Sequence, residues 1–235
     1  MELSAQARQS LEIPFYSNLK CNELEHDSFA HCFDKSLFTR FGKITYQFND
    51  LGYRTKPVDD FVGDEILVIG DSFTLGLGVN ALDRYSEQAE DILGHSVLNF
   101  SLNGASNDWI ARKTNALLQI FHPRYIIIHW TFSHRREKNQ PEWKDNERTE
   151  CEPLYSDQDN LQNWIENFNK IKFPNVLHSA IPDWHPDFDY SIYPISPPIQ
   201  RQDRSRDGFH YGPKTHRALA EKITNFLAAH EPHPW

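Results

Sequence analysis

The stretch that decides the fold is residues 65–73, which read Glu-Ile-Leu-Val-Ile-Gly-Asp-Ser-Phe. The run 66–69 is apolar and rich in β-branched residues, which is typical of a strand buried on both faces of a parallel sheet. Gly70 ends this run and places Ser72 just beyond the carboxyl end of the predicted strand. Because α/β folds bind ligands at that end of their strands, Ser72 is a candidate reactive group.

From this stretch onward, residues 64–229 alternate between strand-like and helix-like segments. Strand-like runs lie at 66–69, 96–100, 125–130 and 175–181, and helical spacing at 84–93, 106–121, 158–171 and 213–229. Repeated strand–helix units connect through right-handed crossovers and produce a parallel sheet with helices on both faces. The sequence therefore predicts one α/β domain over residues 63–235.

The segments outside this alternation are predicted to be additions to the domain. Residues 1–62 show no sustained period, and we interpret them as an N-terminal extension that packs on the main domain. Within it, residues 41–54 look like a hairpin, because Ile44, Tyr46 and Phe48 alternate and turn residues follow. Residues 131–157 are polar and contain two prolines, which indicates a lid or an excursion.

Composition narrows the possible partners and location. The formal net charge is -9 without a basic stripe, so we expect no nucleic-acid partner. The N-terminus lacks the pattern of a signal peptide and no apolar run reaches transmembrane length, so we expect a cytoplasmic protein without a membrane partner. Cys21, Cys32 and Cys151 have no metal-like spacing, and we interpret them as reduced thiols, with no metal site and no cofactor.

A carboxylate and an imidazole occur together far downstream of Ser72. Residues 207–210 read Asp-Gly-Phe-His and immediately precede the last predicted helix. A serine hydroxyl is a poor nucleophile until a base removes its proton, and imidazole titrates near neutral pH. Asp207 could hold one ring nitrogen of His210 while the other nitrogen faces Ser72, which is the arrangement of an activated serine.

Three short blocks carry a resemblance to a known family. The stretches 70–73 (Gly-Asp-Ser-Phe), 99–104 (Asn-Phe-Ser-Leu-Asn-Gly) and 207–210 (Asp-Gly-Phe-His) resemble three of the four sequence blocks of the SGNH, or GDSL-type, hydrolases, in the same order. The resemblance implies a flavodoxin-like three-layer α/β/α sandwich and the hydrolysis of an ester. By position it implies Ser72 as nucleophile, His210 as base and Asp207 as orienting acid. The backbone N–H groups of Ser72 and Gly104 would then face the oxyanion.

The fourth block of that family is where this chain departs. That block places a Gly-x-Asn-Asp motif after the third strand, and its asparagine donates a hydrogen bond to the oxyanion. Here residues 129–137 read His-Trp-Thr-Phe-Ser-His-Arg-Arg-Glu, and Ser133 falls where the asparagine is expected. The Ser133 hydroxyl could replace the amide, Arg135 could reach in, or the stretch could only shape the pocket.

Simpler interpretations of the same residues stay open. Ser72 could be a helix cap, His210 a surface histidine, Asp207 a turn residue and Gly104 a conformational necessity. His216 is interpreted as a packing residue or a surface residue of the last helix. The residues predicted to line a substrate pocket are Asp71, Phe73, Asn103, Trp130, Thr131, Arg135 and Phe209. Trp184, Tyr190 and Tyr193 could stack on a substrate or pack in loops.

The functional hypothesis is a serine esterase or deacylase that acts on a small-molecule ester, with an O-acetylated sugar among the candidates. Two alternatives remain at this point. One is a non-catalytic ligand-binding domain of the same fold, suggested by the missing asparagine. The other is an acyltransferase that uses the same three residues and passes the acyl group to a hydroxyl other than water. The sequence does not predict an oligomeric state.

Overall fold

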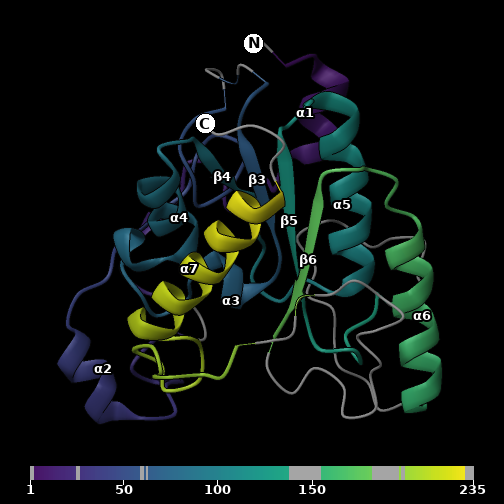
Figure 1. Cartoon of the computed structure of the whole chain (residues 1–235). Helices are drawn as coiled ribbons and strands as arrows, with labels where there is room; N and C mark the ends of the chain where they lie inside the picture. The colour runs from purple at the N-terminus through teal and green to yellow at the C-terminus, as the bar shows by residue number, and fades with distance from the viewer. Residues whose placement is uncertain are drawn as a thin grey trace.

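The structure, a computed structural model, describes residues 3–24, 27–58, 61, 63–137, 155–181, 196 and 199–230. Its centre is a four-stranded sheet in the order β4-β3-β5-β6, with all neighbours parallel (Figure 1). The strands are β3 (Ile66–Ile69), β4 (Val97–Asn99), β5 (Tyr125–Trp130) and β6 (Val176–Ala180). All four strands lie within the predicted runs, so the prediction of a parallel sheet is confirmed.

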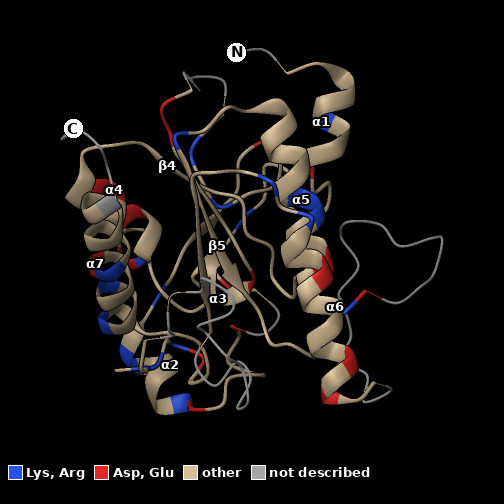
Figure 2. Ribbon diagram, turned by 45° about the vertical axis from the view of Figure 1, so that its right-hand side comes forward, with Lys and Arg blue, Asp and Glu red and all other residues tan. Residues whose placement is uncertain are grey.

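Two pairs of helices cover the two faces of this sheet. Figure 2 shows α4 (Tyr85–Leu93) and α7 (Pro213–His230) on one side, and α5 (Asn107–Ile120) and α6 (Asp157–Asn169) on the other. The side chains of β3 are fully buried between the two layers, as the apolar run predicted. Side-chain caps define two helix starts, since Ser106 and Ser156 accept backbone hydrogen bonds at the first turns of α5 and α6. The three-layer α/β/α prediction is therefore confirmed.

The N-terminal extension differs from its predicted form. It contains two short helices, α1 (Ala5–Leu11) and α2 (Lys35–Phe41), and two short strands, β1 (Lys20–Cys21) and β2 (Tyr46–Gln47). The strand β2 pairs antiparallel with β1, so residues 41–54 do not form the predicted hairpin with themselves.

The hairpin fails because the turn after β2 closes on itself. The Asn49 side-chain oxygen accepts hydrogen bonds from the backbone of Leu51 and Tyr53. The Leu51 carbonyl then accepts from the Ile13 N–H, which draws the chain away from β2 and toward the end of α1. The two helices were missed because each has only seven residues, too short for a clear period in the sequence.

The extension is tied to the main domain through a buried ion pair. The Arg206 guanidinium donates from Nε to Asp27 Oδ1 at 2.9 Å and from Nη2 to Asp27 Oδ2 at 2.5 Å. The hydroxyl of Tyr46 on β2 donates to the same carboxylate. Arg206 also donates to the backbone carbonyls of Asn22 and Gly42. Burial raises the pKa of Asp27 more than these donors lower it, so the carboxylate depends on its partners to stay ionised.

Several expectations fall on parts of the chain outside this description. Residues 138–154, which make up most of the predicted lid at 131–157 and include Cys151, lie outside the described residues. The same holds for Trp184, Tyr190 and Tyr193. Cys21 and Cys32 are both free thiols. Among the helices that the structure describes, none has the length and apolar character needed to cross a bilayer.

The buried ion pair leads to a prediction on stability. Replacing Arg206 with Met leaves the Asp27 carboxylate buried without its cation, and we expect the free energy of unfolding to fall by about 3–5 kcal/mol. Urea denaturation measures the change. The matched control is Arg217→Met, which removes an exposed partner of Glu221 on α7 and is expected to cost under about 1 kcal/mol. Equal losses in the two variants would contradict a special role for the Asp27–Arg206 pair.

Candidate active site

Ser72 lies at the turn between β3 and the four-residue helix α3 (Ser72–Leu75). Asp71 caps this helix, because its side chain accepts a hydrogen bond from the Phe73 N–H at 3.0 Å. The turn is tight: a Cβ atom on Gly70 would lie 2.2 Å from Thr74 Oγ1 and 2.9 Å from the His129 carbonyl oxygen. Only glycine fits at this position, and the close turn holds Ser72 at the carboxyl end of the sheet.

The structure brings Ser72, His210 and Asp207 together. The Ser72 Oγ atom lies 2.8 Å from His210 Nε2, and His210 Nδ1 lies 2.5 Å from Asp207 Oδ2. The other carboxylate oxygen of Asp207 accepts from Ser205 Oγ at 2.6 Å and from the backbone N–H of Phe209 and of His210, at 2.8 and 3.1 Å. All three residues are at most 5 % exposed. These contacts have the lengths expected of a nucleophile, a base and an orienting acid.

The electrostatics keep Asp207 ionised. Burial raises the pKa of its carboxyl group, but the hydrogen bonds from His210, Ser205 and the backbone outweigh this effect and lower the pKa to about 2. An ionised Asp207 favours the tautomer of His210 that carries its proton on Nδ1. The Nε2 lone pair is then available to accept the proton of the Ser72 hydroxyl.

The loop that carries the acid and the base is held against the turn that carries Ser72. The Arg206 N–H donates to the Gly78 carbonyl at 2.9 Å, and the Gly78 N–H donates to the Tyr46 hydroxyl at 2.8 Å. Gly78 has φ +77°, and a Cβ atom there would lie 2.6 Å from Ser205 Oγ. Glycine at 78 thus permits the close approach that sets the distance between Ser72 and His210.

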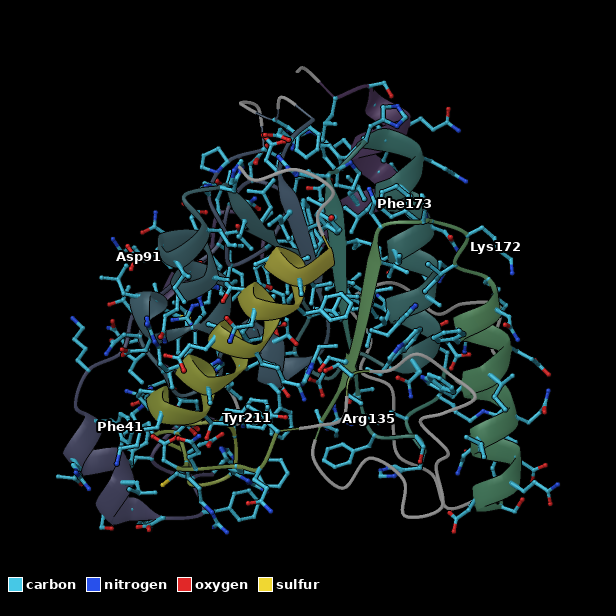
Figure 3. The ribbon with its side chains drawn as sticks, viewed as in Figure 1. Phe41, Asp91, Arg135, Lys172, Phe173 and Tyr211 are labelled. Carbon is cyan, nitrogen blue, oxygen red and sulfur yellow. The ribbon has the colours of Figure 1, made fainter. Side chains whose placement is uncertain are left out.

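Asp71 anchors the segment that follows β5. Its Oδ2 atom accepts hydrogen bonds from Thr131 Oγ1 at 2.5 Å and from Arg135 Nη1 at 3.0 Å. Figure 3 shows Arg135 and Tyr211 at the same end of the molecule, opposite Lys172 and Phe173 in the loop that precedes β6. Arg135 therefore ties the segment after β5 to the residue before Ser72, and since this contact uses one of its five N–H donors, its role at the oxyanion stays a prediction.

The residues expected to face the oxyanion follow the carboxyl ends of three neighbouring strands, β3, β4 and β5. Among the described residues, no acceptor is recorded for the Ser72 backbone N–H. Gly104 lies in the loop between β4 and α5 with φ +79°. The Asn103 side-chain nitrogen beside it is buried, and no hydrogen-bond partner is recorded for it within the described part of the chain. Ser133 is only 8 % exposed, in the turn after β5.

Two other predicted residues prove to be structural. Trp130 was expected to line the pocket, but it is fully buried and donates from Nε1 to His178 Nδ1 at 3.1 Å. Its ring also packs edge-on against Trp164 of α6, so the helix layer draws this side chain into the core. His216 is fully buried and accepts from the Tyr85 N–H at 3.2 Å, in agreement with the packing role predicted for it.

Sequence reasoning missed several residues that support the site. Asn107, the first residue of α5, donates to the Phe132 carbonyl and accepts from the Thr131 N–H, which holds the segment after β5. Ser205 and Arg206 hold Asp207 and its loop. No pattern in the sequence marks these residues, because a polar side chain is ordinary at a helix start or in a loop.

No metal cluster accompanies the three residues within the described part of the chain, where no group of three or more His, Cys, Asp or Glu side chains is arranged to hold an ion. A cavity of about 770 Å³ lies elsewhere, lined by parts of residues 18–57 and by Ala81 and Arg84. It contains none of Ser72, Asp207 and His210. Arg54, which lines it, donates instead to the carbonyls of Gly76 and Val79 behind α3.

Comparison with known proteins gives matches among solved structures only. No protein-family model matches the chain, and no curated protein does. One similar structure is a family 2 carbohydrate esterase with a carbohydrate-binding domain from Corynascus thermopiles (Myceliophthora fergusii), with 14% identity, TM-score 0.47 and coverage of 74% of this chain and 68% of that one.

Two further similar structures come from bacteria. One is a protein assigned to the G-D-S-L family of lipolytic proteins from Desulfitobacterium hafniense DCB-2, with 14% identity, TM-score 0.44 and coverage of 68% of this chain and 98% of that one. The other is the psychrotrophic esterase EstA from Pseudoalteromonas sp., with 13% identity, TM-score 0.44 and coverage of 71% and 97%. The chain is thus similar in structure to SGNH/GDSL hydrolases and carbohydrate esterases at low sequence identity.

The low pKa of Asp207 predicts how stability depends on pH. The folded-state pKa of about 2 lies below the ordinary value of 3.8, so the contribution of Asp207 to stability is complete above about pH 4 and is lost as pH falls through 2. Asp207→Asn lacks this contribution. We expect the difference in unfolding free energy between the wild type and this variant to shrink by about 2 kcal/mol between pH 5 and pH 2, measured by urea denaturation. A difference that stays constant over this range would contradict the assignment.

Proposed function

We propose that this protein is a serine hydrolase that cleaves esters through an acyl-enzyme on Ser72. The observation that carries the proposal is the continuous hydrogen-bonded path from Ser72 Oγ through the His210 ring to the Asp207 carboxylate, with steps of 2.8 and 2.5 Å. The resemblance of the sequence blocks around these residues to SGNH hydrolases agrees with it. A serine at a strand end, an imidazole and a buried acid are together the parts of an acyl-transfer site.

In the proposed reaction, Ser72 Oγ attacks the ester carbonyl while its proton passes to His210 Nε2. Asp207 stabilises the imidazolium ion that forms, as a carboxylate with a low pKa is suited to do. The tetrahedral intermediate collapses, the C–O bond to the alcohol breaks, and His210 returns the proton to the departing alkoxide. A water molecule, deprotonated by His210, then attacks the acyl-enzyme and releases the carboxylic acid and free Ser72.

The oxyanion of the intermediate needs hydrogen-bond donors. We propose the backbone N–H of Ser72 as the first, since no acceptor for it is recorded among the described residues. Gly104 supplies the second by its position in the loop after β4. The Ser133 hydroxyl is the first candidate for the third, because Ser133 stands where the family's asparagine is expected. Arg135, which Asp71 holds in the same segment, is the other candidate.

The proposed substrate is a small-molecule ester, and an O-acetylated sugar is within this class. The absence of an asparagine in the turn after β5 favours, as a second candidate, a domain of this fold that binds a ligand without turnover. An acyltransferase would use the same Ser72, His210 and Asp207, and differs only in the acceptor of the acyl group. Product analysis with an added alcohol separates transfer from hydrolysis.

The first functional prediction concerns Ser72 itself. In Ser72→Ala the attacking oxygen is gone, and we expect kcat for p-nitrophenyl acetate to fall by about 10⁴-fold or more. A fluorophosphonate probe should label the wild type at Ser72 and not the variant. The matched control is Ser10→Ala on the exposed surface of α1, which should keep both activity and labelling. A wild type that folds but neither hydrolyses nor reacts would favour the binding domain.

The second functional prediction concerns the third oxyanion donor. If Ser133 donates to the oxyanion, Ser133→Ala should lower kcat by about 10²-fold with little change in KM, because the bond forms only in the transition state. Steady-state kinetics on the same ester measure both constants. Ser133→Thr keeps the hydroxyl and should recover part of the loss. A Ser133→Ala variant with unchanged kcat would show that the turn only shapes the pocket.

A further inference from the structure

A row of phenylalanine rings runs from the protein surface to the imidazole of His210. Phe33, in the extension just before α2, lies 5.4 Å from Phe209 between ring centroids. Phe209 lies 5.1 Å from the His210 ring and 5.7 Å from Phe73, the residue after Ser72. Phe73 lies 6.1 Å from Phe132 in the segment after β5. Four separate parts of the chain thus contribute to one row beside the Ser72–His210 pair.

The rings along the row differ in exposure. Phe73 is only 3 % exposed and forms the buried floor, whereas Phe33 is 78 % exposed and Phe209 is half-buried. An exposed phenylalanine next to a second, partly exposed one forms an apolar surface in water, and covering it with an apolar group is favourable. Phe33 and Phe209 therefore form an apolar surface that extends from solvent to the His210 ring.

Hydrogen bonds and close backbone contacts hold this apolar surface in place. The Phe33 N–H donates to the Asp207 carbonyl at 2.7 Å, directly beside the orienting acid. Gly208 lies so close to Asp34 that a Cβ atom there would meet the Asp34 nitrogen at 2.9 Å. The carbonyls of Gly208 and Phe209 accept from the Arg204 and Arg201 guanidinium groups. Phe33 is consequently held against the loop that carries Asp207 and His210.

We propose that Phe33 and Phe209 form a binding subsite for the apolar alkyl or aryl part of the ester. The inference rests on the proposed function and narrows its substrate class, from any small ester to esters that carry an apolar group larger than a methyl. Because Phe209 packs edge-on against the His210 ring, a group that rests on it lies beside the atom that exchanges the proton with the leaving alcohol. The apolar group can belong to the acyl side or to the alcohol side of the ester.

The subsite predicts a dependence on chain length. Covering one methylene group is worth about a threefold to fourfold gain in kcat/KM when the group is fully removed from water. The wild type should therefore favour p-nitrophenyl hexanoate over p-nitrophenyl acetate if the acyl chain binds at this subsite. It should favour hexyl acetate over ethyl acetate if the alcohol chain does. A preference in one series and not the other identifies the side of the ester.

The variant that tests the subsite is Phe33→Ser. Phe33 is mostly exposed, so its replacement is expected to leave the fold intact, which thermal unfolding checks. We expect about a tenfold loss in kcat/KM on the longer substrate of the favoured series, and a change within about twofold on the short one. The matched control is Phe15→Ser, which removes another phenylalanine, 68 % exposed, from the segment after α1. It should change neither.

The outcomes separate this inference from the proposed function. Equal losses on long and short esters in Phe33→Ser, or no loss on either, would overturn the subsite while leaving the hydrolase proposal intact. If the wild type hydrolyses no ester, the subsite is tested by calorimetric titration of acetate, hexanoate and octanoate into Ser72→Ala. Affinity that rises with chain length and loses this rise in Ser72→Ala/Phe33→Ser supports the subsite, and the same affinities in both proteins overturn it.

Discussion

Arg206 makes the contacts on which the rest of the site depends. Its side chain is paired with Asp27 in the N-terminal extension, and its backbone N–H donates to Gly78 behind the turn of Ser72. The next residue is Asp207, which holds the His210 ring. A single residue thus joins three parts of the chain, and its buried charge makes the junction sensitive to the loss of either ionic partner.

The opposite side of the site is organised by Asp71. This carboxylate caps α3 and accepts from Thr131 and Arg135, so the segment after β5 is drawn toward the helix that starts at Ser72. The amide of Asn107 holds the same segment from α5. Arg135 thus ties this segment to the residue before Ser72, and Ser133 lies in the same segment, which lacks an asparagine.

The N-terminal extension contacts the residues that hold the site in position. Its strand β2 supplies Tyr46, which bonds both to Asp27 and to Gly78. The segment before α2 supplies the backbone contact to Asp207 and the exposed Phe33 ring. These contacts hold residues of the extension against the loop that carries Asp207 and His210, and they place the exposed Phe33 ring beside Phe209.

Local patterns in the sequence were enough for the sheet, its helices and the places of Ser72, Asp207 and His210, because burial imposes a regular spacing on strands and helices. The same patterns predicted a hairpin at 41–54 that does not form, because β2 pairs with distant residues such as Lys20. They also predicted that Trp130 lines a pocket, whereas its ring packs in the core against the distant Trp164. The sequence by itself determined which groups exist and at which strand ends they lie. Only the tertiary structure decided that Arg206 meets Asp27, that Arg135 meets Asp71 and that Phe33 meets Phe209, because ion pairs and ring contacts between remote segments leave no periodic trace along the chain.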